Sequence, residues 1–186
     1  EIYLSELNHI DDVARFTADR FFLRDALSFG NIKLTAEELI KVRERENLDI
    51  LTITDNSGKV LLRTNNVELS GDDQSHNELI KTVLTSKQPV MATSLVAADD
   101  LQKESPRLAE QAHFKFIDTP KARAREETEE TRGMMLEAAA PVFDYGDNLI
   151  GVVYSGVLLN RNFVIVDKTK QTVYQRKKYQ ANSVML

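Results

Sequence analysis

Two strand-turn-strand segments constrain the fold of this chain more than any other feature. The first runs over residues 48–54 and 59–63, around the turn Asp-Asn-Ser-Gly, and the second over 133–144 and 148–159, around Tyr-Gly-Asp. Apolar residues that alternate on both sides of a short turn containing Asp and Gly are typical of antiparallel hairpins. The chain therefore contains two hairpins that lie far apart in the sequence.

The segment before the first hairpin has a helical pattern. Apolar residues recur at helical spacing through residues 3–29, which predicts one long amphipathic helix. Its opening turns, residues 3–16, carry a narrow apolar stripe that suits a seam between two helices. Thr35, with Glu38 three residues later, predicts a capped second helix that ends near residue 46.

The segment between the hairpins mixes helices and strands. Residues 77–85 and 107–112 have helical patterns, and residues 89–95 and 112–118 have strand patterns. Residues 119–132 are dense in charge, and their simplest interpretation is a solvated loop. A mobile lid over a pocket is the alternative.

The pattern after the second hairpin is again helical, over residues 160–178, and residues 182–186 could begin a strand. We divide the chain into three parts. Residues 1–46 hold the long helix and the second helix, and residues 47–160 form the sheet-bearing domain. Residues 161–186 hold an exit helix and the start of either a second module or a membrane-proximal segment.

Composition excludes several classes of function. A chain of 186 residues supports one core, and its formal charge of -5 gives no reason to expect nucleic acid as a partner. The absence of cysteine excludes disulfides, thiolate zinc sites and thiol nucleophiles. No phosphate loop, nucleophile elbow or metalloprotease motif occurs, so we expect neither an enzyme nor a metal site.

No apolar run approaches the ~20 residues that span a bilayer, so the chain is either cytosolic or cut from between membrane segments.

Four stretches carry a family resemblance. They are LDILTITDNSGKVLLR (48–63), GDD (71–73), LAEQAHFKFIDTPKA (108–122) and GMMLEAAAPVFDYGDNLIGVVYSGVLLNRNFVIVD (133–167). In this order the chain resembles the Cache sensor family, the extracytoplasmic PAS-like ligand-binding domains of bacterial histidine kinases and chemoreceptors. The resemblance covers about residues 10–175.

The resemblance implies an α+β fold, with a PAS-like five-stranded antiparallel sheet and a long N-terminal helix. It also implies a periplasmic sensor that is anchored by membrane helices outside this chain. The sensor would form a homodimer through the N-terminal helix and bind a small molecule without a cofactor. A Cache-like dimerisation or relay module without a ligand is the alternative. An intracellular PAS-like protein with a larger cofactor is disfavoured, because the sequence offers no haem attachment and no flavin platform.

The resemblance also bears on the class of ligand. Cache pockets lie between the sheet and the segments that link its strands, and small anions there need fixed hydrogen-bond donors. The amino-acid signature of some Cache receptors ends in Trp-Tyr, whereas this chain has no tryptophan. A small organic acid, of the carboxylate type, is therefore the predicted ligand.

Arg63 is the first candidate for the ligand site, because it ends a strand where the linking segment begins. It could reach the cavity and bind an anion there. The alternative is an ion pair at the edge of the strand with Asp72, Asp73 or Glu68, which would contribute little.

Glu137 is the second candidate, because it interrupts an apolar strand. A buried carboxylate needs a hydrogen bond, an opposite charge or a wet cavity. Lys115 on a neighbouring strand is a natural partner, and a role in the pocket is the alternative. The small residues 138–140, opposite Ser155 and Gly156, either leave space for a ligand or let a helix pack closely on the sheet.

The three histidines, His9, His76 and His113, lack the spacing of a metal site. His76 and His113 remain candidate hydrogen-bond donors in the pocket. The full set of predicted ligand-binding residues is Arg63, His76, Thr93, His113, Lys115, Glu137 and Tyr154.

Overall fold

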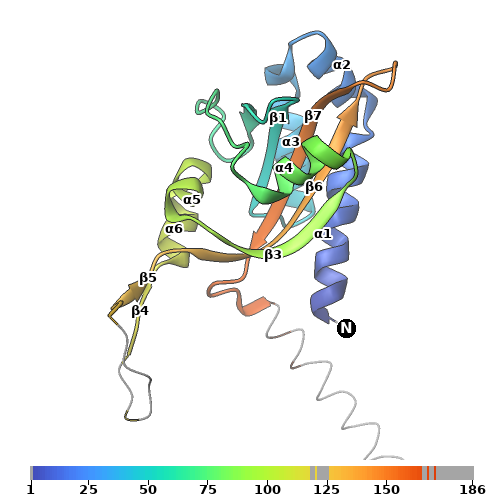
Figure 1. Ribbon diagram of the computed structural model, residues 1–186. Helices are drawn as coiled ribbons and strands as arrows, with labels where there is room; N and C mark the ends of the chain where they lie inside the picture. Colours follow the sequence, from blue (N-terminus) through green and yellow to red (C-terminus); the bar gives the residue numbers. More distant parts are fainter. Residues whose placement is uncertain (1, 118–119, 121–125, 165–166, 168–169, 171–186) are drawn as a thin grey trace, which may run out of the picture.

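The computed structural model describes residues 2–117, 120, 126–164, 167 and 170 (Figure 1). Its centre is an antiparallel sheet of five strands in the order β2-β1-β7-β6-β3. The strands are β1 (Ile50–Asp55), β2 (Val60–Arg63), β3 (Val90–Val96), β6 (Gly133–Phe143) and β7 (Leu149–Leu158). Both predicted hairpins are present, and the predicted α+β class with a five-stranded antiparallel sheet and an N-terminal helix is confirmed.

The helices of the N-terminal part pack on one face of the sheet (Figure 1). They are α1 (Ile2–Ala18), α2 (Phe21–Ser28), the short 3-10 helix η1 (Ile32–Thr35) and α3 (Ala36–Arg45). Buried side chains such as Ile10, Leu23 and Leu39 pack with Leu51 and Val153 of the sheet in one core. This burial of apolar surface is the main force that holds the helices on the sheet.

The prediction of one unbroken helix over residues 3–29 is wrong. Helix α1 ends at Ala18, and Arg20 has an extended backbone (φ -70°, ψ 126°) before α2 begins. The break contains neither proline nor glycine, so local sequence does not require it. The change of direction lets Leu23 and Ala26 bury their side chains, and this tertiary gain outweighs the helical pattern.

The capping box predicted at Thr35 is also absent. Thr35 has a helical backbone, and its side chain caps no backbone N–H of α3. Its hydroxyl donates a hydrogen bond to the Ile32 carbonyl at 2.7 Å instead. Helix η1 leads directly into α3, so the extended backbone of a capping residue does not form there.

Three short helices cover the opposite face of the sheet. They are α4 (Glu78–Ser86), α5 (Ala98–Glu104) and α6 (Pro106–Ala112). The Asn77 side chain caps α4 by accepting hydrogen bonds from the N–H groups of Leu79 and Ile80 at 2.9 and 3.2 Å. Leu101 and Leu108 join Ile80 in a second apolar core against this face.

The strand predicted at residues 112–118 does not belong to the main sheet. The strand observed within this segment, β4 (Phe114–Lys115), pairs with β5 (Glu129–Glu130) in a separate ribbon that projects away from the sheet (Figure 1). Strand β3 takes the place beside β6, where residues such as Val90 reach the second core. The predicted pair between Lys115 and Glu137 is therefore wrong, because Lys115 lies opposite Glu129.

The side chains of β6 alternate between the two faces. Leu136, Ala138 and Ala140 belong to the core under α1, whereas Met135 and Ala139 belong to the core under α4. The small side chains of residues 138 and 140 suit the close contact that α1 makes with β6. Close helix packing thus accounts for these two alanines.

The predicted exit helix, residues 160–178, and the strand predicted at 182–186 lie mostly outside the described residues, as does the centre of the segment 119–132. The division of the chain at residues 46 and 160 stays a prediction. Within the described part of the chain, no helix combines the length and the apolar character that a membrane crossing requires.

Candidate functional site

Each of the five strands contributes a polar side chain to the face under α4, α5 and α6. These side chains are Arg63 on β2, Thr52 on β1, Tyr154 on β7, Glu137 on β6 and Ser94 on β3. Thr52 pairs with Arg63 on one side and with Tyr154 on the other, so the three residues share a face. We call these five residues the polar row.

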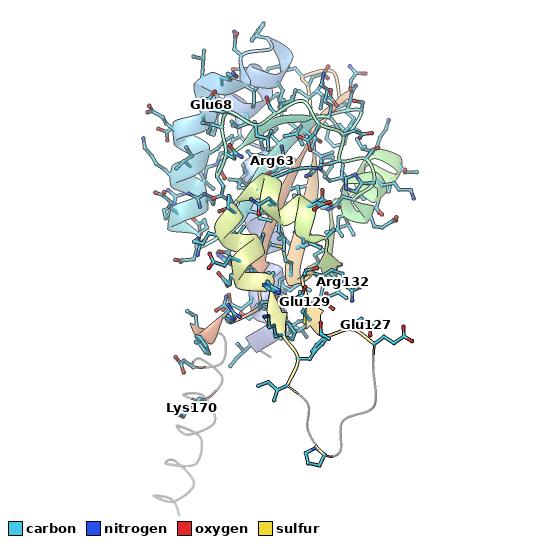
Figure 2. The ribbon with its side chains drawn as sticks, turned by 90° about the vertical axis from the view of Figure 1, so that its left-hand side faces the viewer. Arg63, Glu68, Glu127, Glu129, Arg132 and Lys170 are labelled. Carbon is cyan, nitrogen blue, oxygen red and sulfur yellow. The ribbon has the colours of Figure 1, made fainter. Side chains whose placement is uncertain are left out.

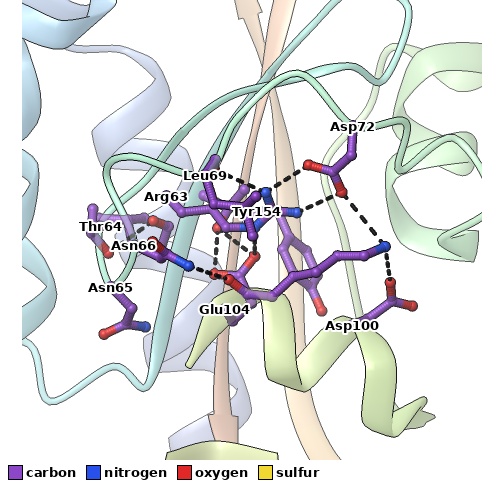
Figure 3. Close-up of polar contacts among 12 residues, drawn as sticks. Arg63, Thr64, Asn65, Asn66, Leu69, Asp72, Asp100, Glu104 and Tyr154 are labelled. Atoms are coloured by element: carbon purple, nitrogen blue, oxygen red, sulfur yellow. Dashed lines mark hydrogen bonds and ion pairs between the residues drawn. The ribbon is translucent and has the colours of Figure 1, made fainter. Parts of the chain in front are cut away.

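Arg63 lies at one end of the polar row and is fully buried (Figure 3). Its two terminal nitrogens donate to the two carboxylate oxygens of Asp72 at 2.7 and 2.9 Å, and its Nε donates to Glu104 Oε1 at 2.9 Å. The Leu69 carbonyl accepts a further hydrogen bond at 3.1 Å. The predicted partner Asp72 is confirmed, whereas Glu68 lies exposed on the connecting loop (Figure 2).

The pKa values of the two carboxylate partners of Arg63 shift in opposite directions. The hydrogen bond from Arg63 lowers the pKa of the Asp72 carboxyl. Burial raises the pKa of the Glu104 carboxyl, although the charge of Arg63 opposes that effect. The two carboxylates therefore differ because Asp72 is partly exposed, whereas Glu104 is buried.

Glu104 was not predicted as a site residue. It is the last residue of α5, it is 2% exposed, and both of its oxygens lie 2.9 Å from the Thr52 hydroxyl. The sequence holds a signal for it, because Glu104 follows the buried Leu101 by three residues and shares its helix face. A carboxylate on the apolar face of a short helix marks a buried polar contact.

Glu137 lies near the other end of the polar row and is 1% exposed. The hydroxyls of Ser94 and Tyr154 each donate a hydrogen bond to its carboxylate, and no ion pair joins it to a described residue. Burial raises the pKa of the Glu137 carboxyl and also that of the Tyr154 hydroxyl. The hydrogen bonds from the two hydroxyls oppose this rise in the pKa of Glu137.

A small cavity lies between the polar row and α5. Its walls are formed by Ile50, Gln74, His76, Asn77, Val96, Asp100, Glu104 and Tyr154, and its volume is about 10 Å³. That volume is the room that about one water molecule needs. At the rim of the cavity, Nε2 of the exposed His76 ring lies 3.0 Å from Oδ2 of Asp100. The predicted chamber between the sheet and the linking segments is present, but it is small.

The sequence over residues 8–173 matches the family described as the double sensory domain of two-component sensor kinases, dCache_3. The chain belongs to the dCache_3 family. The described part of this dCache_3 chain holds one five-stranded sheet and the small β4–β5 ribbon. A comparison with curated proteins finds no match.

Three solved structures share the fold of this dCache_3 chain. The sensor domain of Escherichia coli DcuS is 18% identical, with a TM-score of 0.54, over 89% of this chain and 98% of that one. The sensor domain of the Vibrio cholerae histidine kinase DctB is 15% identical, with a TM-score of 0.55, over 83% and 50%. The periplasmic domain of Vibrio cholerae LuxQ is 17% identical, with a TM-score of 0.53, over 89% and 63%. At these identities the likeness shows the fold alone.

Of the predicted site residues, His76 and Tyr154 line the cavity of the dCache_3 domain. Glu137 contacts Tyr154, and Arg63 contacts the cavity residue Glu104, so these two lie behind the wall. Thr93 lies on the opposite face of the sheet, where its hydroxyl bonds the Tyr3 hydroxyl of α1. The neighbouring Ser94 occupies the polar row instead, because successive residues of a strand point to opposite faces.

The two remaining candidates lie on or beside the β4–β5 ribbon of the dCache_3 domain. Nε2 of His113 lies 2.9 Å from Oε2 of Glu129, and Lys115 lies opposite the same glutamate. Figure 2 shows Glu129 far from Arg63. Among the described residues no group of three or more His, Cys, Asp or Glu side chains is placed to hold a metal ion.

A larger hollow, of about 810 Å³, lies on the α1 side of the dCache_3 domain, with Glu6, His9, Arg43 and Asp49 among the residues of its wall. Val164 also lines it, and the next two residues lie outside the described part of the chain.

Proposed function

We propose that this chain is the extracytoplasmic ligand-sensing domain of a two-component sensor kinase. A small molecule binds between the sheet and α4 to α6, at the cavity beside the polar row. The observation that carries the proposal is the buried cavity itself, where Tyr154 of the sheet, Glu104 of α5 and Gln74 of the loop converge. Convergent polar groups around a largely apolar hollow are the usual composition of a small-molecule site.

The packing of the sheet offers a route for the signal. Tyr154 faces the cavity, whereas its neighbour Ser155 faces α1 and lies within 3.4 Å of the Ile10 carbonyl. A ligand that shifts β7 therefore also shifts the surface on which α1 packs. Such a ligand acts only through its difference in affinity for the two arrangements.

The proposal includes an assembly and a location. Two copies pair along α1, whose outer surface leaves Leu4 and Asn8 exposed. Membrane segments outside this chain place it on the periplasmic face of the bacterial inner membrane. The likeness to a structure described as the periplasmic domain of LuxQ supports that location. The output is a histidine kinase, with a chemotaxis receptor as the alternative.

An organic acid is the ligand class that the sequence predicts, and it stays a prediction. Arg63 was the candidate residue to bind its carboxylate, and Arg63 already holds Asp72, Glu104 and the Leu69 carbonyl. An acid that binds Arg63 must displace one of these acceptors.

A relay module without a ligand is the second candidate function. The small volume of the cavity, about 10 Å³, favours it, because a ligand larger than water must widen the space.

A thermal-shift screen of organic acids, amines and sugars separates the two functions. A ligand at a hundred times its dissociation constant adds about 2.7 kcal/mol to the free energy of unfolding. For a ligand found in this way, His76→Ala at the rim of the cavity should weaken the shift. His9→Ala, in the hollow beside α1, is the matched control and should leave it unchanged. The absence of a shift with every compound would favour the relay module.

A further inference from the structure

One residue of the cavity wall carries a hydrogen-bond acceptor that no described donor satisfies. Gln74 is 3% exposed and lines the cavity, and its Oε1 finds no hydrogen-bond partner among the residues that the structure describes. A buried acceptor without a donor is costly, so a group that supplies N–H or O–H is favoured there.

Glu104 adds a second acceptor with spare capacity. Its Oε1 accepts from Arg63 Nε, and both of its oxygens share the single hydrogen of the Thr52 hydroxyl. An ionised carboxylate has about four acceptor positions, so Oε2 can accept a further hydrogen bond.

The cations of this region already have acidic partners. Arg63 binds Asp72 and Glu104, while Lys103 lies 3.6 Å from Asp72 and 3.2 Å from Asp100 (Figure 3). These two basic side chains thus face three carboxylates. The region has one carboxylate more than it has lysine and arginine side chains, with His76 as a further partner of Asp100, and an added positive charge is favoured.

We propose that the ligand carries a primary ammonium group that enters this cavity and donates to Gln74 Oε1 and Glu104 Oε2. This inference rests on the proposed function and names the class of its ligand. An ammonium group is about as large as the water molecule for which the cavity has room. The rest of the ligand extends past the rim at His76 and Asp100, where the His76 side chain is 55% exposed.

A carboxylate head group fits the same cavity poorly. Its oxygens would face Gln74 Oε1 and the Glu104 carboxylate, and these pairs of acceptors repel one another. The structure thus favours the opposite charge from the one that the sequence predicts for the ligand.

The test measures the melting temperature of the whole chain with methylammonium, tetramethylammonium, acetate and succinate salts at matched ionic strength. Methylammonium should raise the melting temperature, and tetramethylammonium should not, because it has the same charge but no N–H donor. Acetate and succinate should give no rise.

Three variants locate the effect. Gln74→Met removes the unpartnered acceptor at similar size and should weaken methylammonium binding about tenfold or more. Gln74→Glu adds a carboxylate and should strengthen it, which keeps the test decisive if Gln74→Met does not fold. Gln88→Met, at an exposed position, is the control and should leave binding unchanged.

The outcomes separate this inference from the proposed function. A rise with acids but not with methylammonium would overturn the ammonium ligand and leave the sensor function standing. An equal rise with tetramethylammonium, or one that Gln74→Met does not reduce, would also overturn it. Failure of every compound in the wider screen would overturn both.

Discussion

The Nε of Arg63 donates a hydrogen bond to Oε1 of Glu104 over 2.9 Å, and this ion pair is buried on both sides. It joins the end of β2 to the last residue of α5, two points separated by more than forty positions of the chain. Helix α5, which contributes to the wall of the cavity, is therefore attached to the sheet by a charged contact. Removal of one partner leaves the other charge buried without compensation.

Glu104→Ala should destabilise the domain strongly for this reason. We expect the free energy of unfolding to fall by about 3–5 kcal/mol, the cost of breaking a buried pair from one side. Urea unfolding at neutral pH measures the change. Glu78→Ala removes a glutamate whose side chain is 78% exposed, and it should change the free energy by less than about 1 kcal/mol. Equal effects of the two variants would show that the Arg63 contact contributes no more than a surface pair.

Glu137→Gln should change how stability depends on pH. Burial raises the pKa of Glu137 in the folded state above the unfolded value of about 4.3. The folded state therefore holds this proton more tightly, and the resulting stabilisation is full below the unfolded pKa and is lost as pH rises through the folded pKa. Glutamine does not ionise, so the variant should gain stability relative to the wild type as pH rises.

Urea unfolding from about pH 4 to pH 8 measures this difference, whose slope is at most about 1.4 kcal/mol per pH unit. Asp72→Asn provides a contrast of opposite sign. The hydrogen bond from Arg63 lowers the pKa of Asp72, so its stabilisation is present above the unfolded pKa of about 3.9 and is lost as pH falls. The loss of unfolding free energy that Asp72→Asn causes should therefore become smaller as the pH falls. A pH-independent difference for Glu137→Gln would contradict the first prediction.

Ser94→Ala and Thr93→Val should have unequal effects, although the two residues are neighbours. The Ser94 hydroxyl donates to the buried Glu137, and its loss should cost about 1–3 kcal/mol. The Thr93 hydroxyl bonds Tyr3 on the other face, in an exposed contact, so its removal at similar size should cost less than about 1 kcal/mol. The free energies of unfolding of the two variants give the comparison. A larger loss for Thr93→Val would mean that the register of β3 is displaced by one residue.

Local patterns were enough for much of the fold. The two hairpins follow from alternating apolar residues around short turns, and the structure contains both. The same reasoning included Asp72 among three possible partners of Arg63 and identified Glu137 as a buried carboxylate that needs partners. These features depend on residues that are close in sequence, or on the cost of burying a charge, which holds in any fold.

Other features were decided by contacts between distant segments. The sequence offers two strand patterns for the place beside β6, and only packing against the second core selects β3 over residues 112–118. The break at Arg20 likewise comes from the burial of Leu23 and Ala26, since residues 3–29 have a continuous helical pattern.

The candidate site shows the same division between sequence and tertiary structure. The sequence by itself determined that polar residues such as Arg63, Glu137 and Tyr154 interrupt apolar strands, because strand periodicity assigns each of them to a face. Only the tertiary structure decided that Glu104 and Gln74 meet them there, since helix α5 and the loop before α4 reach the sheet through long-range packing. Burial then set the charge of the cavity, because the free energy of a carboxylate or an amide depends on the partners that the fold places around it.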